Sequence, residues 1–229
     1  MQLFYQPNIE KTSFLNEEDS RHCVKVLRHN NGDTIHVVDG MGGLFTCMIA
    51  KADAKKCELK ITNTEREWGK RDRYLHIAIA PTKNADRLEW FIEKATEIGI
   101  DEISLILTKN SERRFQKIER LEKIAISGMK QSLKAYLPKI NELTDYKKFI
   151  ESPLNQQKLI AHLEENTLAL SKTTLADKVC VLIGPEGDFT QQEIDLAKAN
   201  GYEMVTLGNA RLRTETAALV ATTLVNNLY

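Results

Sequence analysis

Hydrophobic and polar positions alternate in short runs along the first part of the chain. Four such runs, rich in Val, Ile, Phe and Thr, lie at 3–6, 33–38, 43–50 and 57–62. Turn-forming pairs such as Asp39-Gly40 separate them, so the pattern predicts β-strands joined by tight turns. One helix is predicted at 17–27, with Asn16 as its N-cap. We therefore expect a small β-barrel that carries one helix.

From about residue 74 the pattern changes, and apolar runs alternate with amphipathic stretches. The apolar runs lie at 75–80, 102–107, 158–162, 179–183 and 204–207. Between the first two runs, apolar residues recur at helical spacing after Asn84, a possible N-cap, and stop at Gly99. Thr190 and Glu193 form a capping-box pattern that predicts a second helix. Alternating strands and helices are typical of a parallel α/β sheet.

These two patterns predict two domains, at 1–70 and 74–229, joined by the charged stretch 64–73. The last predicted helix, 215–228, is apolar on most of its faces. A helix that lies on a protein surface normally keeps a polar stripe. We therefore expect this helix to be covered by its own sheet and by a second copy of the chain, which predicts a homodimer.

Two glycine-bearing loops follow short apolar strands in the last fifth of the chain. The first loop reads Gly184-Pro185-Glu186-Gly187, and the second runs from Leu207-Gly208 to Ala217. In a parallel sheet, ligands bind at the carboxyl ends of the strands. Neither loop has the glycine spacing of a dinucleotide-binding motif or of a P-loop, which argues against NAD and ATP. The loops predict a pocket for another cofactor.

The segments 183–186 and 207–217, taken together and in this order, resemble two motifs of the SPOUT methyltransferases. Within that superfamily the chain is similar to the bacterial 16S rRNA uridine N3-methyltransferases, the ribosomal RNA small subunit methyltransferase E family. The segments 22–28, 83–99 and 129–132 extend the resemblance over nearly the whole chain. Asp188 stands where the family pattern leads us to expect glycine, and Lys134 where we expect arginine.

The resemblance implies a fold and a cofactor. The fold is α/β, a SPOUT-type parallel sheet with a C-terminal trefoil knot, preceded by a small PUA-like β-barrel domain. The cofactor is S-adenosyl-L-methionine, and the partner is 16S rRNA or the small ribosomal subunit. The resemblance assigns cofactor binding to the two loops and their neighbours: Leu163, Ile183, Gly184, Pro185, Glu186, Gly187, Leu207, Gly208, Leu212, Arg213, Thr214, Thr216 and Ala217.

Arg213 and Glu215 are the candidate catalytic residues. N3 of uracil carries a proton at neutral pH, so methylation there requires that this proton leave and that the resulting anion be stabilised. The permanently charged guanidinium of Arg213 suits that stabilisation. Glu215 is a candidate general base, but a carboxylate in the first turn of a helix is held in its charged form and is a weak base. Catalysis and a purely electrostatic role for Glu215 both stay open.

The formal net charge is zero, so only the distribution of charge can indicate a nucleic-acid partner. Residues 109–139 hold nine basic and three acidic side chains, and 21–29 holds three basic side chains, two histidines and no acid. Such runs can also be ordinary solvated helix faces. The charge pattern and the resemblance together give these RNA-binding candidates: Arg21, His22, Lys25, Arg28, Lys83, Arg87, Lys94, Lys130 and Gln131. Among the aromatic residues, Trp68, Trp90 and Phe189 could stack on bases, and for Trp90 we favour a place in the core over stacking.

The remaining composition excludes several classes of protein. The four cysteines are scattered, without a Cys-x-x-Cys pair, and the five histidines complete no zinc spacing, so we predict no metal. No apolar run reaches the length of a membrane span, and the first residues lack the pattern of a signal peptide. We expect a cytoplasmic protein that does not bind membranes.

The function that these observations predict is methylation of N3 of a specific uridine in 16S rRNA of the small subunit, with S-adenosylmethionine as donor. Two alternatives stay open. One is a SPOUT methyltransferase that acts on another rRNA position or on tRNA. The other is a non-catalytic RNA-binding protein of the same fold.

Overall fold

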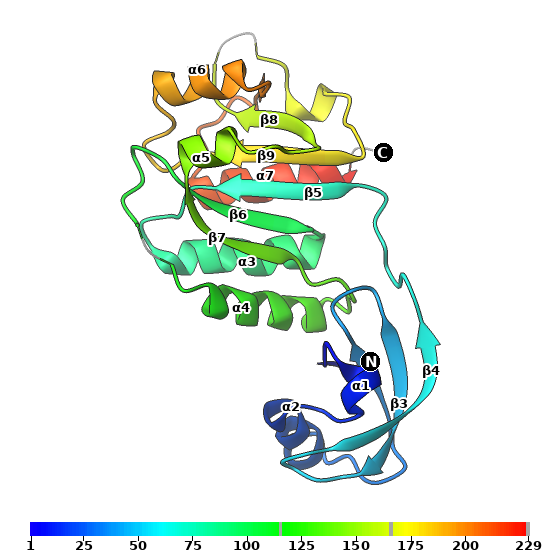
Figure 1. Ribbon diagram of the computed structural model, residues 1–229. Coiled ribbons are helices and arrows are strands. Elements are labelled where there is room, and N and C mark those ends of the chain that lie inside the picture. The colour runs from blue at the N-terminus through cyan, green and yellow to red at the C-terminus, as the bar shows by residue number, and fades with distance from the viewer. Residues whose placement is uncertain (115, 165–166, 228–229) are drawn as a thin grey trace. The chain divides into compact units, whose positions relative to one another are not determined.

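The computed structural model describes residues 1–114, 116–164 and 167–227 (Figure 1). The chain divides into two compact units. The first comprises Met1–Lys70 and Ile126–Leu137, and the second comprises Arg71–Ala125 and Pro138–Tyr229. Residues 126–137 thus belong to the first unit, whereas the boundaries expected from sequence place them in the second domain.

The first unit contains a four-stranded sheet in the order β1-β2-β3-β4. Its strands are β1 (Leu3–Tyr5), β2 (Thr34–Val38), β3 (Leu44–Lys51) and β4 (Glu58–Glu65). β1 pairs with β2 in parallel, and the other pairs are antiparallel. A short helix, α1 (Ile9–Thr12), follows β1. The core on this sheet includes Phe4, Val37 and Phe45, all less than 2% exposed.

The predicted helix at 17–27 is α-helical only in its first half. α2 (Glu17–Arg21) begins at the predicted cap, where the Asn16 side chain accepts a hydrogen bond from the Asp19 backbone N–H at 2.8 Å. The chain then continues as a π-helix, η1 (His22–Val26). The wider π turn keeps Cys23 fully buried and leaves Val26 64% exposed. The spacing of apolar residues alone does not predict this change of helix type.

The second unit contains a six-stranded sheet in the order β10-β8-β9-β5-β6-β7, and every neighbouring pair is parallel. Its strands are β5 (Tyr74–Ile79), β6 (Glu102–Leu107), β7 (Lys139–Asp145), β8 (Gln157–Ala161), β9 (Lys178–Ile183) and β10 (Glu203–Val205). The parallel sheet is confirmed. We predicted no strand for β7, because this edge strand mixes polar with apolar residues. β10 also ends earlier than the predicted run at 204–207.

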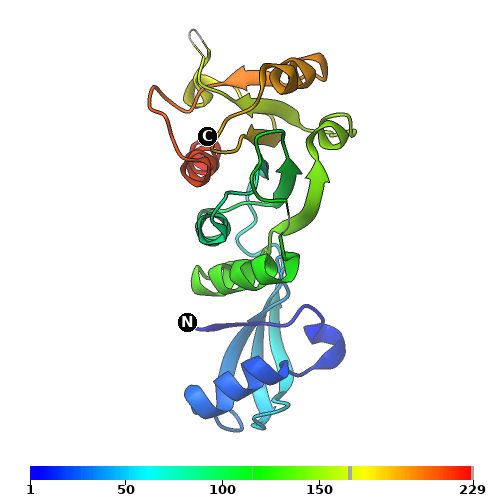
Figure 2. The same cartoon turned by 90° about the vertical axis from the view of Figure 1, so that its left-hand side faces the viewer.

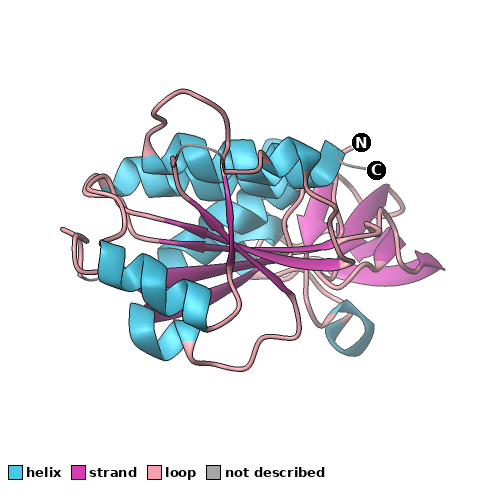
Figure 3. Cartoon of the chain, turned by 90° about the horizontal axis from the view of Figure 1, so that it is seen from above, coloured by secondary structure: helices cyan, strands magenta, loops and turns pink. Residues whose placement is uncertain are grey.

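Helices cover both faces of this sheet (Figure 3). The helices of this part of the chain are α3 (Ala85–Ile98), α5 (Tyr146–Ile150), α6 (Gln191–Ala199), α7 (Thr214–Asn227) and the short 3-10 helix η2 (Leu170–Lys172). A further helix, α4 (Ile118–Gln131), begins in the second unit and ends in the first. Within the second unit, α3 packs against α7 on one face, and α5 packs against α6 on the other (Figure 2). We predicted no helix for α4. Its buried residues Leu121, Ala125 and Met129 recur at every fourth position.

The predicted helix starts at Asn84 and at Thr190 are confirmed. The Asn84 side chain caps α3 by accepting from the Asp86 N–H at 2.9 Å. Thr190 and Glu193 form the complete capping box of α6. A buried core that includes Ile106, Leu182 and Phe189 lies beneath α5 and α6. The two caps fix the first turns of α3 and α6, and the buried core holds α5 and α6 in place.

The final helix, α7, is less covered within one chain than its composition led us to expect. Ala218, Ala221 and Val225 are buried, but Leu219, Val220 and Leu224 are only partly buried. The three partly buried residues lie on one face of the helix at i, i+1 and i+5. That apolar face is therefore partly open in the single chain. Within the described ranges, no helix is both long and apolar enough to cross a lipid bilayer.

Candidate cofactor pocket

A cavity of about 470 Å³ lies at the carboxyl ends of β8, β9 and β10. Pockets for small organic ligands usually have volumes of about 300–1,000 Å³. The lining residues are Ala161, His162, Leu163, Ile183, Gly184, Pro185, Glu186, Asp188, Thr206, Leu207, Gly208, Ala210, Arg211, Leu212, Arg213, Thr214 and Ala217. The two glycine loops that are separate in sequence therefore meet at one cavity.

The first glycine loop follows β9 and is held by neighbouring segments. The Asn110 side-chain amide donates to the carbonyls of Gly187 and Asp188 at 3.1 and 3.0 Å. The Lys83 backbone N–H donates to Glu186 Oε1 at 3.0 Å. A Cβ on Gly184 would lie 3.1 Å from the Phe189 ring, which is tighter than ordinary contact. Glycine at 184 therefore lets the loop fold back onto the buried Phe189.

The second glycine loop follows β10 and depends on backbone conformation. Gly208 has φ +125°, a conformation that side-chain-bearing residues rarely adopt. No atom lies within 4 Å of the position that its Cβ would take, so space does not restrict this position. Thr206 Oγ1 donates to the Gly208 carbonyl at 2.9 Å and closes the turn. Position 208 therefore requires glycine because of its φ value and not because of a lack of space.

Two buried polar residues lie at the start of α7; Thr214 lines the pocket, whereas Glu215, a predicted catalytic residue, is not among the lining residues. Thr214 and Glu215 are 4% and 6% exposed, and in the part of the chain that the structure describes, Thr214 Oγ1 and Glu215 Oε2 have no hydrogen-bond partner. Leaving such groups unpaired costs about 1–3 kcal/mol each unless a ligand or water satisfies them. The other oxygen, Glu215 Oε1, lies 3.8 Å from Arg87 Nε. The carboxylate therefore faces Arg87, a residue that we predicted to bind RNA.

The structure gathers most of the predicted cofactor residues around the cavity but not all of them. Gly187 and Thr216 are not among its lining residues. Sequence reasoning missed Ala161, His162, Asp188, Thr206, Ala210 and Arg211, which do line it. Most of these lie in or beside the two loops, so the position of the loops was a usable signal. His162 ends the predicted run 158–162, and a carboxyl-end residue of a parallel strand is a general candidate for ligand contact.

The RNA-binding candidates of the first unit differ in how free their charges are. Arg21, Lys25 and Arg28 are exposed, and the described residues contain no ion-pair partner for them. Arg28 has φ 60°, in the left-handed region. Lys130 pairs with the buried carboxylate of Asp19 at 2.9 Å. His22 is half-buried and Gln131 is exposed. The free positive charge therefore lies mainly on α2 and η1.

In the second unit, the candidate cations around α3 have acidic neighbours. Lys83 pairs with Glu112 at 2.8 Å, and Lys94 pairs with Glu93 and Glu97 at 2.7 and 2.9 Å. Each partner raises the pKa of its lysine, so both lysines stay charged, but part of their charge is compensated.

The aromatic residues that we considered for base stacking differ in exposure. Trp90, which we expected in the core, is 42% exposed because it lies on the outer face of α3. Phe189 is 5% exposed and packs at 5.6 Å from the Tyr146 ring, so it has no free face for a base. Trp68 is partly buried against the Leu3, Val38 and Leu44 cluster. Trp90 is therefore the most accessible of the three side chains.

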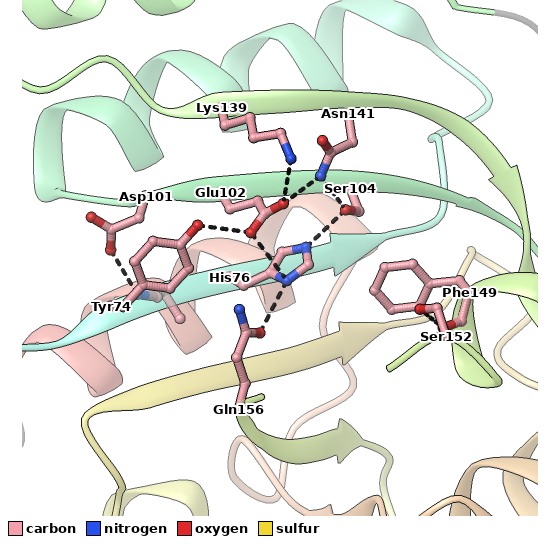
Figure 4. Close-up of polar contacts among 11 residues, drawn as sticks. Tyr74, His76, Asp101, Glu102, Ser104, Lys139, Asn141, Phe149, Ser152 and Gln156 are labelled. Atoms are coloured by element: carbon pink, nitrogen blue, oxygen red, sulfur yellow. Dashed lines mark hydrogen bonds and ion pairs between the residues drawn. The ribbon is translucent and has the colours of Figure 1, made fainter. Parts of the chain in front are cut away.

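A buried polar cluster lies at the opposite, amino end of the sheet in the second unit (Figure 4). Glu102, at the start of β6, accepts hydrogen bonds from Tyr74 at 2.7 Å and from Asn141 at 2.7 Å. His76 on β5 lies 2.8 Å from Ser104 Oγ through Nε2 and 3.2 Å from Gln156 Oε1 through Nδ1. Sequence reasoning gave no sign of this cluster, because its members come from four separate segments.

Burial and the neighbouring charges set the titration of this cluster. Burial lowers the pKa of His76 below its ordinary value. Burial alone would raise the pKa of Glu102, but His76, the hydrogen bonds from Asn141 and Tyr74, and the charge of Lys139 together lower it. Ser104, His76 and Glu102 have the composition of a hydrolase triad, but Ser104 is only 2% exposed and no substrate can reach it. The cluster is structural.

The described residues contain no group of three or more His, Cys, Asp or Glu side chains that could hold a metal ion. All four cysteines are buried and reduced. The polar groups that line the pocket are instead backbone amides, hydroxyls, one histidine, two arginines and two carboxylates. Such a set suits an organic cofactor better than a metal.

Two family models match the chain. A model of the RNA methyltransferase domain matches residues 70–226, and a model of the RNA methyltransferase PUA domain matches residues 15–62. Among curated proteins, the chain is similar to the ribosomal RNA small subunit methyltransferase E of Mesomycoplasma hyopneumoniae (strain 232). The two are 33% identical over 150 residues, which cover 63% of this chain and 65% of that relative.

Two solved structures are similar over the full chain. A protein described as a probable rRNA-methyltransferase from Porphyromonas gingivalis is 41% identical, with a TM-score of 0.93, and the match covers 100% of this chain and 98% of that one. The ribosomal RNA small subunit methyltransferase E from Neisseria gonorrhoeae, solved with bound S-adenosyl methionine, is 26% identical, with a TM-score of 0.90 and coverage of 100% and 98%.

Proposed function

This chain belongs to the RNA methyltransferase family, and from that premise we propose that it transfers the methyl group of S-adenosylmethionine to N3 of a specific uridine in 16S rRNA. The observation that carries the proposal is the meeting of the two glycine loops at one cavity of suitable size. The similarity to small-subunit rRNA methyltransferases supports the choice of substrate.

The pocket residues fit S-adenosylmethionine. Ile183, Leu207 and Leu212 supply apolar surface for an adenine ring, and the backbone of both loops supplies N–H and C=O groups that can read its edge. The unpartnered hydroxyl of Thr214 is a further donor or acceptor inside the cavity. The remaining contacts that we propose come from Leu163, Gly184, Pro185, Glu186, Gly208, Arg213 and Ala217, with Gly187 and Thr216 supporting the loops.

The bound cofactor supplies an already activated methyl group on its sulfonium, so the protein contributes mainly position and electrostatics. Arg213 is exposed at the pocket and is free to reach the acceptor base. We propose that its guanidinium stabilises the uracil anion that forms when the N3 proton leaves. A fixed positive charge near O2 or O4 would favour the deprotonated base.

Glu215 has a different place in this proposal. It lies in the first turn of α7 and within 3.8 Å of Arg87 Nε. We propose that it holds Arg87 beside the pocket. The alternative, that Glu215 Oε2 accepts the N3 proton, remains the second candidate for catalysis because this oxygen is buried and unpartnered.

RNA binding is assigned in this proposal to the exposed cations Arg21, Lys25 and Arg28, with Lys83, Arg87 and Lys94 near the catalytic domain's first helix. Changing Arg21, Lys25 and Arg28 together to alanine should weaken rRNA binding and flatten its dependence on salt, because fewer counterions are released. Filter binding at several salt concentrations measures both effects. An unaltered salt slope would show that these cations are ordinary solvated side chains.

We also propose that the protein is a cytoplasmic homodimer with a C-terminal trefoil knot. The partly open apolar face of Leu219, Val220 and Leu224 on α7 supports the dimer. The strand order, in which β10 returns to pair with β8 before α7 packs on β5 and β9, is compatible with the knot. Light scattering that reports a monomer with retained activity would contradict the dimer.

The test of the function combines cofactor titration with rRNA mapping. Isothermal titration should show binding of S-adenosylmethionine and S-adenosylhomocysteine, and no binding of NAD or ATP. Mass mapping of 16S rRNA from a strain that lacks the gene should show one uridine without its N3 methyl group. Loss of a modification in tRNA or at another rRNA position would identify a different methyltransferase. RNA binding without cofactor binding would identify a non-catalytic protein.

A further inference from the structure

Two pocket residues that the proposed mechanism does not use lie close to each other. His162 follows β8, and Asp188 lies in the first glycine loop. His162 Nδ1 is 3.0 Å from Asp188 Oδ2, and the two side chains are 20% and 50% exposed. Both residues line the cavity. The contact therefore joins two walls of the pocket that come from different strands.

The backbone at Asp188 makes this contact informative. Its φ is 58°, in the left-handed region, where glycine fits without cost and aspartate is tolerated better than most residues. Oδ1 accepts a hydrogen bond from the Phe189 N–H at 2.7 Å, which fixes the carboxylate with Oδ2 toward His162. A glycine at 188 would adopt the same turn but would lack both contacts.

The other contacts of this loop come from elsewhere in the sheet. Asn110, after β6, holds the carbonyls of Gly187 and Asp188, and the Lys83 N–H, after β5, holds Glu186. His162 is itself fixed by a backbone hydrogen bond to Val205 of β10 at 3.1 Å. The His162 contact thus ties the Asp188 side chain to the β8 and β10 side of the pocket.

We propose that His162 and Asp188 form a positioning pair that holds the first glycine loop against the end of β8, so that the pocket is formed before its ligand arrives. This inference rests on the proposed function, in which the pocket takes S-adenosylmethionine. The two atoms are close but are not aligned as a hydrogen bond, so the contact is a polar attraction between the imidazole and the carboxylate. Preorganisation of this kind improves affinity because the ligand does not have to order the loop.

A double-mutant cycle tests the pair. Asp188→Gly removes the carboxylate without straining the backbone, and His162→Phe removes both ring nitrogens but keeps a ring. Each variant should weaken binding of S-adenosylmethionine and S-adenosylhomocysteine by about fivefold in isothermal titration, and the double variant should be no weaker than about tenfold, because residues in contact are not additive. His162→Gln, which can still donate to the carboxylate, should lose less affinity than His162→Phe.

Amide hydrogen exchange on the ligand-free protein gives a second readout. Residues 184–189 should exchange several-fold faster in both single variants, while the melting temperature stays close to that of the wild type. A merely structural contact would lower the melting temperature without a selective change in this loop. The exchange measurement needs no ligand, so it tests the pair even if the wild-type protein fails to bind S-adenosylmethionine and the proposed function is wrong.

Three results would overturn the proposal. Multiplication of the two single effects to about 25-fold in the double variant would show that the residues act independently. Loss of affinity for S-adenosylmethionine alone, with S-adenosylhomocysteine unaffected, would show that Asp188 meets the sulfonium charge directly. Unchanged hydrogen exchange at 184–189 in both variants would show that the pair does not hold the loop.

Discussion

The two ends of the parallel sheet in the second unit differ in how their polar groups are satisfied. At the amino end, both nitrogens of His76 and both oxygens of Glu102 have close partners (Figure 4). At the carboxyl end, the described residues leave Thr214 Oγ1 and Glu215 Oε2 buried and unpaired. The same six strands therefore carry a closed network at one end and an open one at the other.

This difference shows how one sheet can be both a rigid scaffold and a binding site. A satisfied buried network stabilises one arrangement of the β-strands, because the loss of any one member leaves its partners without hydrogen bonds. Unpaired buried groups cost stability and are retained where a ligand can satisfy them. The loops that carry them also depend on Gly184 and Gly208, whose roles are close packing and an unusual φ. We therefore predict that the amino end contributes mainly stability and the carboxyl end mainly ligand binding.

The largest expected effect is on cofactor binding at the carboxyl end of the sheet, when Gly208 is replaced. Gly208→Val should reduce S-adenosylmethionine affinity by about a hundredfold or more, because a β-branched residue cannot hold φ +125° and the loop must move. Gly201→Val is the matched control, since Gly201 also has positive φ and open space but lies outside the pocket. Both variants should lose similar stability in urea unfolding. Equal affinity for the cofactor in the two variants would contradict the assignment.

The next effect concerns the chemistry at the same end. Arg213→Ala should lower single-turnover methylation by about a hundredfold, the scale of losing one preorganised partner of a developing anion. Glu215→Gln should cost less if Glu215 only holds Arg87. A glutamine variant that is slower than the alanine variant and is rescued by raising the pH would instead identify Glu215 as the base, because solvent would then take over the deprotonation.

Breaking the amino end should have the opposite signature. Glu102→Ala removes the acceptor of Tyr74 and Asn141 and should lower the free energy of unfolding by about 1–3 kcal/mol, since it removes two hydrogen bonds of partly buried donors to a charged acceptor. Cofactor affinity should stay within about twofold. Glu203→Ala is the control, because Glu203 also begins a strand of this sheet but is exposed, and it should change stability by less than about 0.5 kcal/mol. A selective loss of cofactor binding in the Glu102→Ala variant would show that the amino-end cluster affects the pocket, and it would contradict the contrast between the two ends.

The smallest expected effect is the pH dependence that His76 gives to stability. Burial lowers its pKa in the folded protein, so the unfolded chain takes up a proton first as the pH falls. The stabilising contribution of neutral His76 is full above about pH 6.5 and declines below it, by at most about 1.4 kcal/mol per pH unit. His76→Gln should flatten the unfolding free energy between pH 7.5 and 5.5. An unchanged slope would place the acid sensitivity elsewhere.

Glu102 contributes in the same direction but at lower pH. Its lowered pKa means that its contribution is present above its ordinary range and is lost as the pH falls through the folded-state value. The two groups therefore act in separate pH windows. Measuring the free energy of unfolding over a pH series that extends below pH 5 distinguishes the two groups. In the Glu102→Ala variant, the additional decline of this free energy below pH 5 should be lost. The decline that His76 causes at higher pH should remain.

Much of the fold follows from local pattern, and the exceptions have physical reasons. The central strands and the caps at Asn16, Asn84 and Thr190 are confirmed because each depends on neighbouring residues alone. β7 was missed because an edge strand need not be continuously apolar. The switch from α2 to the π-helix η1, which contains the buried Cys23, could not be predicted because the spacing of apolar residues does not distinguish the two helix types.

The candidate site divides in the same way. The two glycine loops could be located from their sequence, because turn chemistry and strand ends are local. The pairing of Glu215 with Arg87, and of Asp188 with His162, joins segments that are far apart in the chain, so only the fold reveals it. The amino-end cluster around Glu102 was invisible for the same reason. The roles of individual pocket residues stay predictions until they are measured.

Amide hydrogen exchange with and without S-adenosylhomocysteine tests the contrast between the two ends most directly. The ligand should slow exchange at 184–189 and 206–217, at the carboxyl end. It should leave 74–76, 102–104 and 139–141 unchanged, because that network is already closed in the free protein. Protection spread evenly over both ends, or confined to the amino end, would contradict the assignment of binding to the glycine loops.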